Sequence, residues 1–230
     1  SNEDVGKVNL MLRQGFDLAG GQADVTVVGY RNRGNSADQI PQRAVDQGLI
    51  GEFGSIDTTL GGESSRYSLS GGWAGRAFEG DFELRAYAID YALDLWSNFT
   101  YLLDDPIQGD QFQQVDERQI YGFIASQQWQ SGRSRWRAGA EGRFDDIGRV
   151  ALLRTTERRV TGTVRDDAVE QGSLGVHAAH EYELSDRLRS YLGLRRDQYW
   201  FDVDASLPAN SGDTSDGITS TKASLAFQAS

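Results

Sequence analysis

The sequence has no cysteine and only three prolines in its 230 residues. Without cysteine, the chain cannot build a disulfide framework, a cysteine-ligated zinc site or a thiol nucleophile. Positive charge is also scarce, since 23 lysines and arginines stand against 34 acidic residues, a formal net charge of −11. This balance argues against nucleic acid as a partner, because phosphates are bound by basic surfaces that release their counterions.

Long apolar segments are missing as well. The chain has no run of about 18 apolar residues, the least that a transmembrane helix requires. No basic stretch followed by an apolar one opens the chain, as a signal peptide would. A transmembrane β-barrel satisfies all of these conditions, because its strands need only about ten residues of alternating polarity.

What the chain does have is alternation of apolar and polar residues. In one stretch Trp136, Ala138 and Ala140 alternate with Arg135 and Arg137, and this period of two is typical of strands. The pattern predicts nine strands, at residues 7–17, 22–31, 66–75, 81–96, 119–130, 135–153, 169–184, 188–205 and 219–230. We expect neighbouring strands to pair in chain order, because the short spacers at 18–21, 131–134 and 185–186 leave room only for hairpins.

Two predicted strands change their apolar parity midway. In 81–96 the apolar positions move from Phe82 and Leu84 to Tyr87 and Ile89, and a similar change occurs within 188–205. A β-bulge would produce this switch, since one extra residue reverses the face. Alternatively, the second half of each strand has left the membrane.

Three features favour a membrane barrel over a soluble β-sandwich. The spacers alternate between short turns and long connections at 32–65, 97–118, 154–168 and 206–218, as in outer-membrane barrels. All three prolines lie in these long connections, where no ladder hydrogen bond is lost. Aromatic residues flank the short turns, where an interfacial girdle belongs; they are Phe16, Trp73, Phe78, Trp129, Trp136 and Tyr182.

The alternation also predicts one continuous apolar face, which a barrel would turn toward lipid. We expect this face to hold Val8, Leu10, Leu12, Val25, Tyr121, Phe123, Ala138, Ala140, Leu174, Val176, Leu225 and Phe227.

Several segments resemble the barrel of TonB-dependent outer-membrane receptors, most closely a poorly characterised proteobacterial subgroup. The resemblance covers essentially the whole chain, and its most similar segments are residues 39–45, 87–91, 95–101, 104–106, 109–112 and 208–212.

The resemblance implies that residues 1–230 are a segment of a 22-stranded transmembrane barrel, an all-β antiparallel up-and-down meander of which about nine strands are present. The family's N-terminal plug domain, its TonB box and its terminal aromatic residue have no counterpart here. The implied function is energy-dependent uptake of a scarce substrate, such as an iron chelate, cobalamin or a carbohydrate, across the bacterial outer membrane. The implied partners are membrane lipid, a transported small molecule and, through the missing N-terminal part, the TonB complex.

No catalytic or metal site is expected. His177 and His180, the only histidines, are three residues apart on a predicted strand and point to opposite faces, so they cannot share a metal ion. The acidic loop 104–110 lacks the spacing of a calcium-binding loop and is interpreted as solvated charge. No nucleophile elbow or phosphate-binding loop is present, so we expect no enzyme activity and no cofactor.

The ligand-binding residues cannot be named individually, and the loops 32–65 and 97–118 are favoured because loops carry specificity. Two alternatives stay open. The chain is a complete small outer-membrane barrel of eight or ten strands, acting as an adhesin or structural protein, or it is a soluble β-sandwich binding module. Nine strands would leave two unpaired edges, so we also expect the chain alone in water to aggregate or to require a larger chain.

Overall fold

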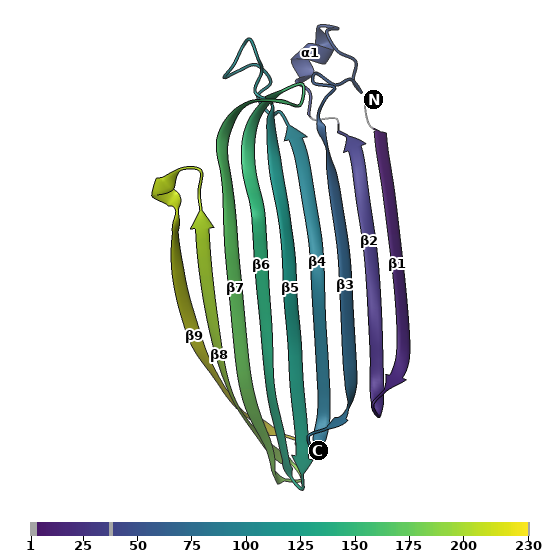
Figure 1. Ribbon diagram of the computed structural model, residues 1–230, viewed down its shortest axis with the longest axis vertical. Coiled ribbons are helices and arrows are strands. Elements are labelled where there is room, and N and C mark those ends of the chain that lie inside the picture. Colours follow the sequence, from purple (N-terminus) through teal and green to yellow (C-terminus); the bar gives the residue numbers. More distant parts are fainter. Residues whose placement is uncertain (1–3, 37–38, 230) are drawn as a thin grey trace.

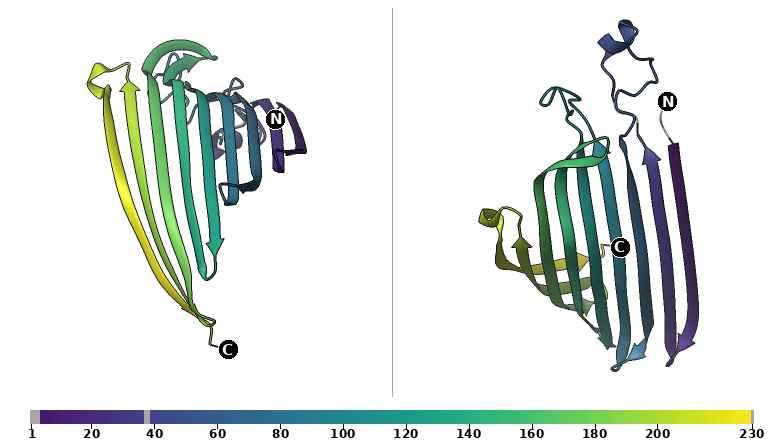
Figure 2. Two further views of the ribbon diagram at one scale, coloured as in Figure 1. Left: turned by 60° about the horizontal axis from the view of Figure 1, so that its bottom comes forward. Right: turned by 45° about the horizontal axis from the view of Figure 1, so that its top comes forward.

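The structure is a computed structural model that describes residues 4–36 and 39–229. It contains nine strands, which form one curved antiparallel sheet (Figures 1 and 2). Their bounds are β1 Asp4–Leu18, β2 Gly21–Asn35, β3 Gly61–Ala77, β4 Gly80–Ser97, β5 Phe112–Ser131, β6 Ser134–Thr156, β7 Arg159–Ser185, β8 Leu188–Asp204 and β9 Gly212–Phe227.

The strands follow one another across the sheet in the order in which they occur in the chain. All eight pairings are antiparallel hairpins, so the predicted meander without Greek-key crossings is confirmed. The helical elements described are the short helix α1 (Gln42–Asp46) and the 3-10 turn η1 (Pro208–Asn210). Because the strand number is odd, β1 begins at the upper end of the sheet and β9 finishes at the lower end (Figure 1).

The strands extend further than the alternation predicted. The loop expected at 32–65 shortens because β2 runs to Asn35 and β3 begins at Gly61, and the loop at 97–118 shortens because β5 begins at Phe112. Their ends are polar and therefore carry no apolar alternation. Residues 37 and 38 of the first loop, and Ser230 of the last predicted strand, lie outside the described residues.

The prediction of a long connection at 154–168 is wrong. Strands β6 and β7 continue through it and meet at a two-residue turn, Glu157–Arg158. Threonine and valine fill this segment, and these β-branched residues favour strands even where charged residues separate them. The turn contains neither glycine nor asparagine, the residues that usually indicate a tight hairpin, so the turn could not be recognised from its residues.

The register confirms the predicted apolar face. One row across the sheet joins Val27, Leu69, Ala88, Tyr121 and Phe144. Because side chains alternate along each strand, the same register brings all twelve predicted residues to this face. We call it the apolar face, and the other face, which carries Glu141, Arg143, Asp145, Arg195 and Asp197, the charged face.

A β-bulge, one of the two explanations that the sequence left open for the parity switch, does not occur at the switch in β4 or β8. Strand β4 pairs in unbroken register on both sides, and β8 pairs with β9 without a shift. The apolar residues of their upper halves therefore move to the charged face. In β4, Tyr87, Ile89 and Tyr91 share that face, whereas Asp90 lies on the apolar face.

The sheet is a single layer, and the described residues include no second sheet packed against it. This excludes the β-sandwich alternative for the described part. Little of the chain is enclosed: the buried apolar cluster consists of Val115, Ala151 and Leu153 near the upper end. Large apolar side chains such as Val8, at 69% exposure, and Leu225, at 70%, lie open on the apolar face.

Tryptophan side chains fasten the lower turns. The indole N–H of Trp73 donates to the carbonyl of Leu18 at 2.8 Å, and that of Trp129 donates to the carbonyl of Phe78 at 3.0 Å. Both rings belong to the apolar face. Two of the aromatic residues predicted to flank the short turns thus also form hydrogen bonds to the turn backbone.

The turn between β3 and β4 is strained. Its central residues, Phe78 and Glu79, have φ angles of 51° and 64°, a left-handed conformation that costs a non-glycine residue about 1–2 kcal/mol. We expect Glu79→Gly to raise the free energy of unfolding by about 0.5–1 kcal/mol, since the added freedom of glycine in the unfolded chain cancels part of the gain. Denaturant titration measures this change. Glu83→Gly, in the regular part of β4, serves as the control and should destabilise the protein.

Candidate functional site

The upper ends of the strands carry the two loops that the sequence favoured. The β2–β3 connection, which includes α1, and the β4–β5 connection at 98–111 stand side by side above the sheet (Figures 1 and 2). The hydroxyl of Tyr101 in the second loop donates to the carbonyl of Gln39 in the first at 2.7 Å. The structure therefore brings the two predicted loops into one assembly.

Asp57 is the centre of this assembly. One carboxylate oxygen accepts hydrogen bonds from the backbone N–H of Thr59 at 2.9 Å and from its hydroxyl at 2.6 Å. The other accepts from the side-chain amides of Gln111 at 2.8 Å and Asn98 at 3.5 Å. Burial by itself raises the pKa of Asp57, but these hydrogen bonds outweigh it and hold the pKa below its ordinary value. Asp57 therefore stays ionised and ties the first loop to both ends of the second.

Gln111 extends the network to the β6–β7 hairpin. Its carbonyl oxygen accepts hydrogen bonds from the hydroxyl of Thr155 at 2.9 Å and from the backbone N–H of Arg158 at 2.8 Å. Its amide also donates to the hydroxyl of Thr59 at 2.7 Å. Gln111 and Thr155 are 3% and 1% exposed, so water is excluded from these bonds and each is costly to break.

Arg158 reaches furthest across the assembly. Its guanidinium donates to the carbonyl of Thr59 at 2.6 Å and to the side-chain oxygen of Asn35 at 3.0 Å. The same group lies 4.7 Å from the centroid of the Trp96 ring, a cation–π geometry. One side chain thus contacts the ends of β2 and β4 and the first loop. The sequence interpretation missed Arg158, because nothing in a single sequence shows which loop arginine meets distant carbonyls.

The acidic segment 104–110 is held by its own backbone. Asp110 accepts hydrogen bonds from the backbone N–H groups of Leu103 at 2.8 Å and Asp105 at 2.7 Å, and Asp105 accepts from those of Ile107 and Gln108. Desolvation by itself raises the pKa of Asp110, and the hydrogen bonds lower it below its ordinary value. Within the described residues, no group of three or more histidine, aspartate or glutamate side chains is placed to hold a metal ion.

The outer surface of the two loops is apolar. Leu49 and Phe53 in the first loop are each 76% exposed, and Leu103 and Ile107 in the second are 73% and 92% exposed. Polar loop side chains such as Asn98 and Thr59 bond instead to Asp57. The loops thus present exposed apolar side chains above a polar network.

The charged face below the loops is lined with paired ions. Asp145, at 1% exposure, accepts two hydrogen bonds from Arg143, at 2.6 and 2.7 Å. Lower down, Arg195 bridges Glu141 and Asp197. These ion pairs make this part of the charged face polar.

The two histidines lie on opposite faces, as predicted. His177 pairs in register with Gly139 on the charged face, whereas His180 stacks on Trp136 on the apolar face with the ring centroids 3.8 Å apart.

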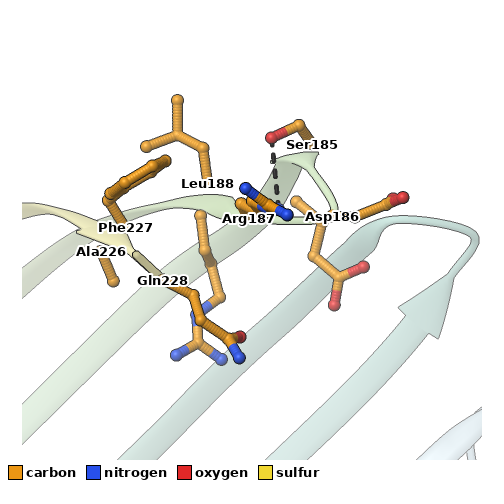
Figure 3. Close-up of a pocket in the computed structure, with 9 residues that line it drawn as sticks. Ser185, Asp186, Arg187, Leu188, Ala226, Phe227 and Gln228 are labelled. Atoms are coloured by element: carbon orange, nitrogen blue, oxygen red, sulfur yellow. Dashed lines mark hydrogen bonds between the residues drawn. The ribbon is translucent and has the colours of Figure 1, made fainter. Parts of the chain in front are cut away.

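A polar hollow at the lower end of the sheet is not a ligand site (Figure 3). It lies beside the β7–β8 turn, where the backbone N–H of Arg187 donates to the hydroxyl of Ser185 at 3.3 Å, and beside the end of β9 at Phe227 and Gln228. Strand β9 has no partner on its far side among the described strands, so one wall of this hollow is missing.

Two solved structures share this fold. The ferric citrate transporter FecA in its unliganded form aligns with a TM-score of 0.75 and 9% identity, over 100% of this chain and 34% of that chain. The copper transporter OprC aligns with a TM-score of 0.64 and 14% identity, over 96% of this chain and 34% of that chain. The chain thus spans about a third of each. No protein-family model and no curated protein matches it.

These alignments define the class of fold. The nine-stranded meander is that of part of a TonB-dependent transporter barrel, which confirms the fold class predicted from the sequence. Within the part of the chain that the structure describes, no helix has the length and apolarity to cross a membrane.

The network around Asp57 has a predictable pH dependence. Because the folded pKa of Asp57 lies below the ordinary 3.8, its stabilising contribution is complete above that value and is lost as the pH falls through the folded pKa. We expect hydrogen exchange at residues 57–60, corrected for intrinsic rates, to stay slow down to about pH 4 and to accelerate below it.

Asp57→Asn provides the test at neutral pH. It replaces an acceptor oxygen with an NH₂ group that faces other donors, and we expect exchange there to accelerate about tenfold, since each lost hydrogen bond is worth roughly 1–1.5 kcal/mol. Asp46→Asn is the matched control, because Asp46 accepts only from Gln42 within α1. Equal effects of the two substitutions would contradict the central role of Asp57.

Proposed function

We propose that the chain is a segment of the barrel of a TonB-dependent receptor in the bacterial outer membrane, and that the receptor takes up a scarce small-molecule substrate. The observation that carries this proposal is the apolar face, which extends over all nine strands of a single-layer meander and is interrupted on β8 by Arg196 and Gln198. In water such a surface invites aggregation, whereas in a bilayer it is the surface that a barrel needs.

The height of the apolar face supports a bilayer. On β6 it runs from Trp136 near the lower turn to Phe144, with Ala138 and Ala140 between them. Eight residues of strand span roughly 27 Å, which the tilt of barrel strands lowers to about 20 Å along the membrane normal. With an aromatic ring at each end, this approaches the band of about 25 Å that outer-membrane barrels turn toward lipid.

The upper limit of this belt is a polar row on the same face. Asp90, Gln119, Asp146, Glu170 and Asp202 pair with one another across β4 to β8. Carboxylates cannot lie in hydrocarbon without a large cost, so this row marks where the strands leave the membrane. It also accounts for the parity switch in β4 and β8.

Transport, and not catalysis, suits the remaining features. The charged face forms a hydrated wall, and the loop assembly around Asp57 presents an apolar surface where a substrate arrives first. We assign first contact with the substrate to the β2–β3 and β4–β5 loops, within the ranges 32–65 and 97–118. The two transporters of similar fold carry ferric citrate and copper; the substrate of this protein is a nutrient of comparable scarcity, such as an iron chelate, cobalamin or a carbohydrate. TonB would act through a plug segment outside residues 1–230.

Arginine substitutions test the membrane orientation. Ala140→Arg places a charge near the middle of the apolar belt and should cost about 2–4 kcal/mol of folding free energy in lipid vesicles. Ser126→Arg is the control, because Ser126 lies on the charged face in register with Glu83, and it should cost little. Equal losses at the two positions in a vesicle folding assay would sink the assignment of the apolar face to lipid.

Uptake measurements test transport. We expect cells that make the full-length protein to accumulate one labelled compound from a panel of ferric chelates, cobalamin and oligosaccharides, and to lose this accumulation when TonB is deleted. Accumulation that persists without TonB would indicate passive diffusion and favour a simple barrel. No accumulation of any compound, combined with surface adhesion, would favour the adhesin alternative.

A further inference from the structure

A shallow hollow interrupts the apolar face across β5 to β8. Its volume is about 360 Å³, at the lower end of the range for ligand pockets. The side chains of the apolar face that line it are those of Tyr121, Phe123, Phe144, Leu174 and Trp200, beside Gly142. The other lining residues are Tyr87, Gly122, Arg143 and Ser173, which by their place in the register belong to the charged face. Tyr121, Phe123, Leu174 and Trp200 are each between 39% and 46% exposed, so the hollow is open along its outer side.

Two glycines shape the hollow. Phe123 pairs in register with Gly142, and Trp200 pairs with Gly172. A Cβ atom at either glycine would overlap the ring of its partner, which shows that each ring lies flat over the neighbouring strand. Larger residues at these positions would push the rings outward and fill the hollow with side chains.

The hollow lies just below the polar row. Tyr121, Phe144, Gly172 and Trp200 form one row across the sheet, and Gln119, Asp146, Glu170 and Asp202 form the next row above it on the same face. The hydroxyl of Tyr121 donates to the side-chain oxygen of Gln119 at 2.7 Å. An elongated apolar molecule in the hollow would therefore have its polar end beside the carboxylate row and its apolar end in the belt.

We propose that this hollow is a binding site for one acyl chain of an outer-leaflet membrane lipid, held between the rings of Phe123 and Trp200. The inference rests on the proposed membrane location of the apolar face. The lining offers an occupant ring faces and methyl groups and almost no hydrogen-bond partners, which matches hydrocarbon and not a polar substrate. The site is also on the opposite face from the ion-paired wall, so it is separate from the transport path.

Quenching of tryptophan fluorescence tests the site. The full-length receptor in detergent is titrated with a phospholipid brominated in the middle of its acyl chains, and the difference between wild type and Trp200→Phe gives the emission of Trp200. We expect Trp200 to be quenched in a saturable manner. Trp136, on the same face at the lower end of the belt, is isolated in the same way with Trp136→Phe and should be quenched in proportion to the lipid fraction without saturation.

A substitution that fills the hollow with a larger side chain tests whether the lipid binds there. Gly142→Leu should weaken saturable quenching by about tenfold or more, since it displaces contact with roughly two methylene groups of the lipid. Gly71→Leu is the matched control, because Gly71 lies on the same face and a Cβ there meets no atom closer than 3.5 Å. Heat-dependent migration on a gel verifies that each variant is folded. Should Gly142→Leu fail to fold, Leu174→Phe fills the same space from β7.

The outcomes separate the two proposals. Saturable quenching that survives both filling variants, or unsaturable quenching of Trp200, overturns the lipid site and leaves the membrane assignment intact. Failure of both tryptophans to be quenched overturns the membrane assignment itself. Dimers that Gly142→Leu dissociates, in the absence of saturable quenching, would assign the hollow to contact between two copies of the chain and overturn the lipid site.

Discussion

The strand-to-strand hydrogen-bond ladder is the interaction on which this molecule depends. A single-layer sheet has almost no interior, and its buried apolar cluster amounts to three side chains near the upper end. Cohesion therefore comes from backbone groups that each find a partner on the neighbouring strand. In hydrocarbon this pairing is obligatory, because an unpaired N–H or C=O group has no water to bind. The register of β4 is unbroken with both of its neighbours.

The ladder leaves the two faces free to take different chemistry. Because side chains alternate, one strand can present Ala140 on the apolar face and Glu141 to Arg195 on the charged face. The ladder also allows a face to change from apolar to polar side chains along one strand. In β4 this change occurs on the apolar face between Ala88 and Asp90, and the register with β5 is unbroken there. The change of face in β4 and β8 is therefore not the mark of a bulge.

The alternation predicted the strands, their order and the composition of the apolar face, because all three follow from a period of two and from short turns. It could not predict the ends of the strands, since the residues at the upper ends no longer alternate between apolar and polar on the same two faces. The hairpin at Glu157–Arg158 was not predicted for this reason, and because its turn lacks glycine. The two favoured loops do meet, but Asp57, Gln111 and Arg158 were not foreseen, since contacts between residues 47 to 99 positions apart depend on the completed sheet.

The loop network also acts on the sheet that supports it. Arg158 joins the tip of the β6–β7 hairpin to Asn35 at the end of β2, and its ring contact with Trp96 includes the end of β4. These contacts connect the upper ends of β2, β4 and the β6–β7 hairpin to one another. The upper end of the sheet is consequently held together by side-chain contacts between strands that are not neighbours, in addition to the backbone ladder.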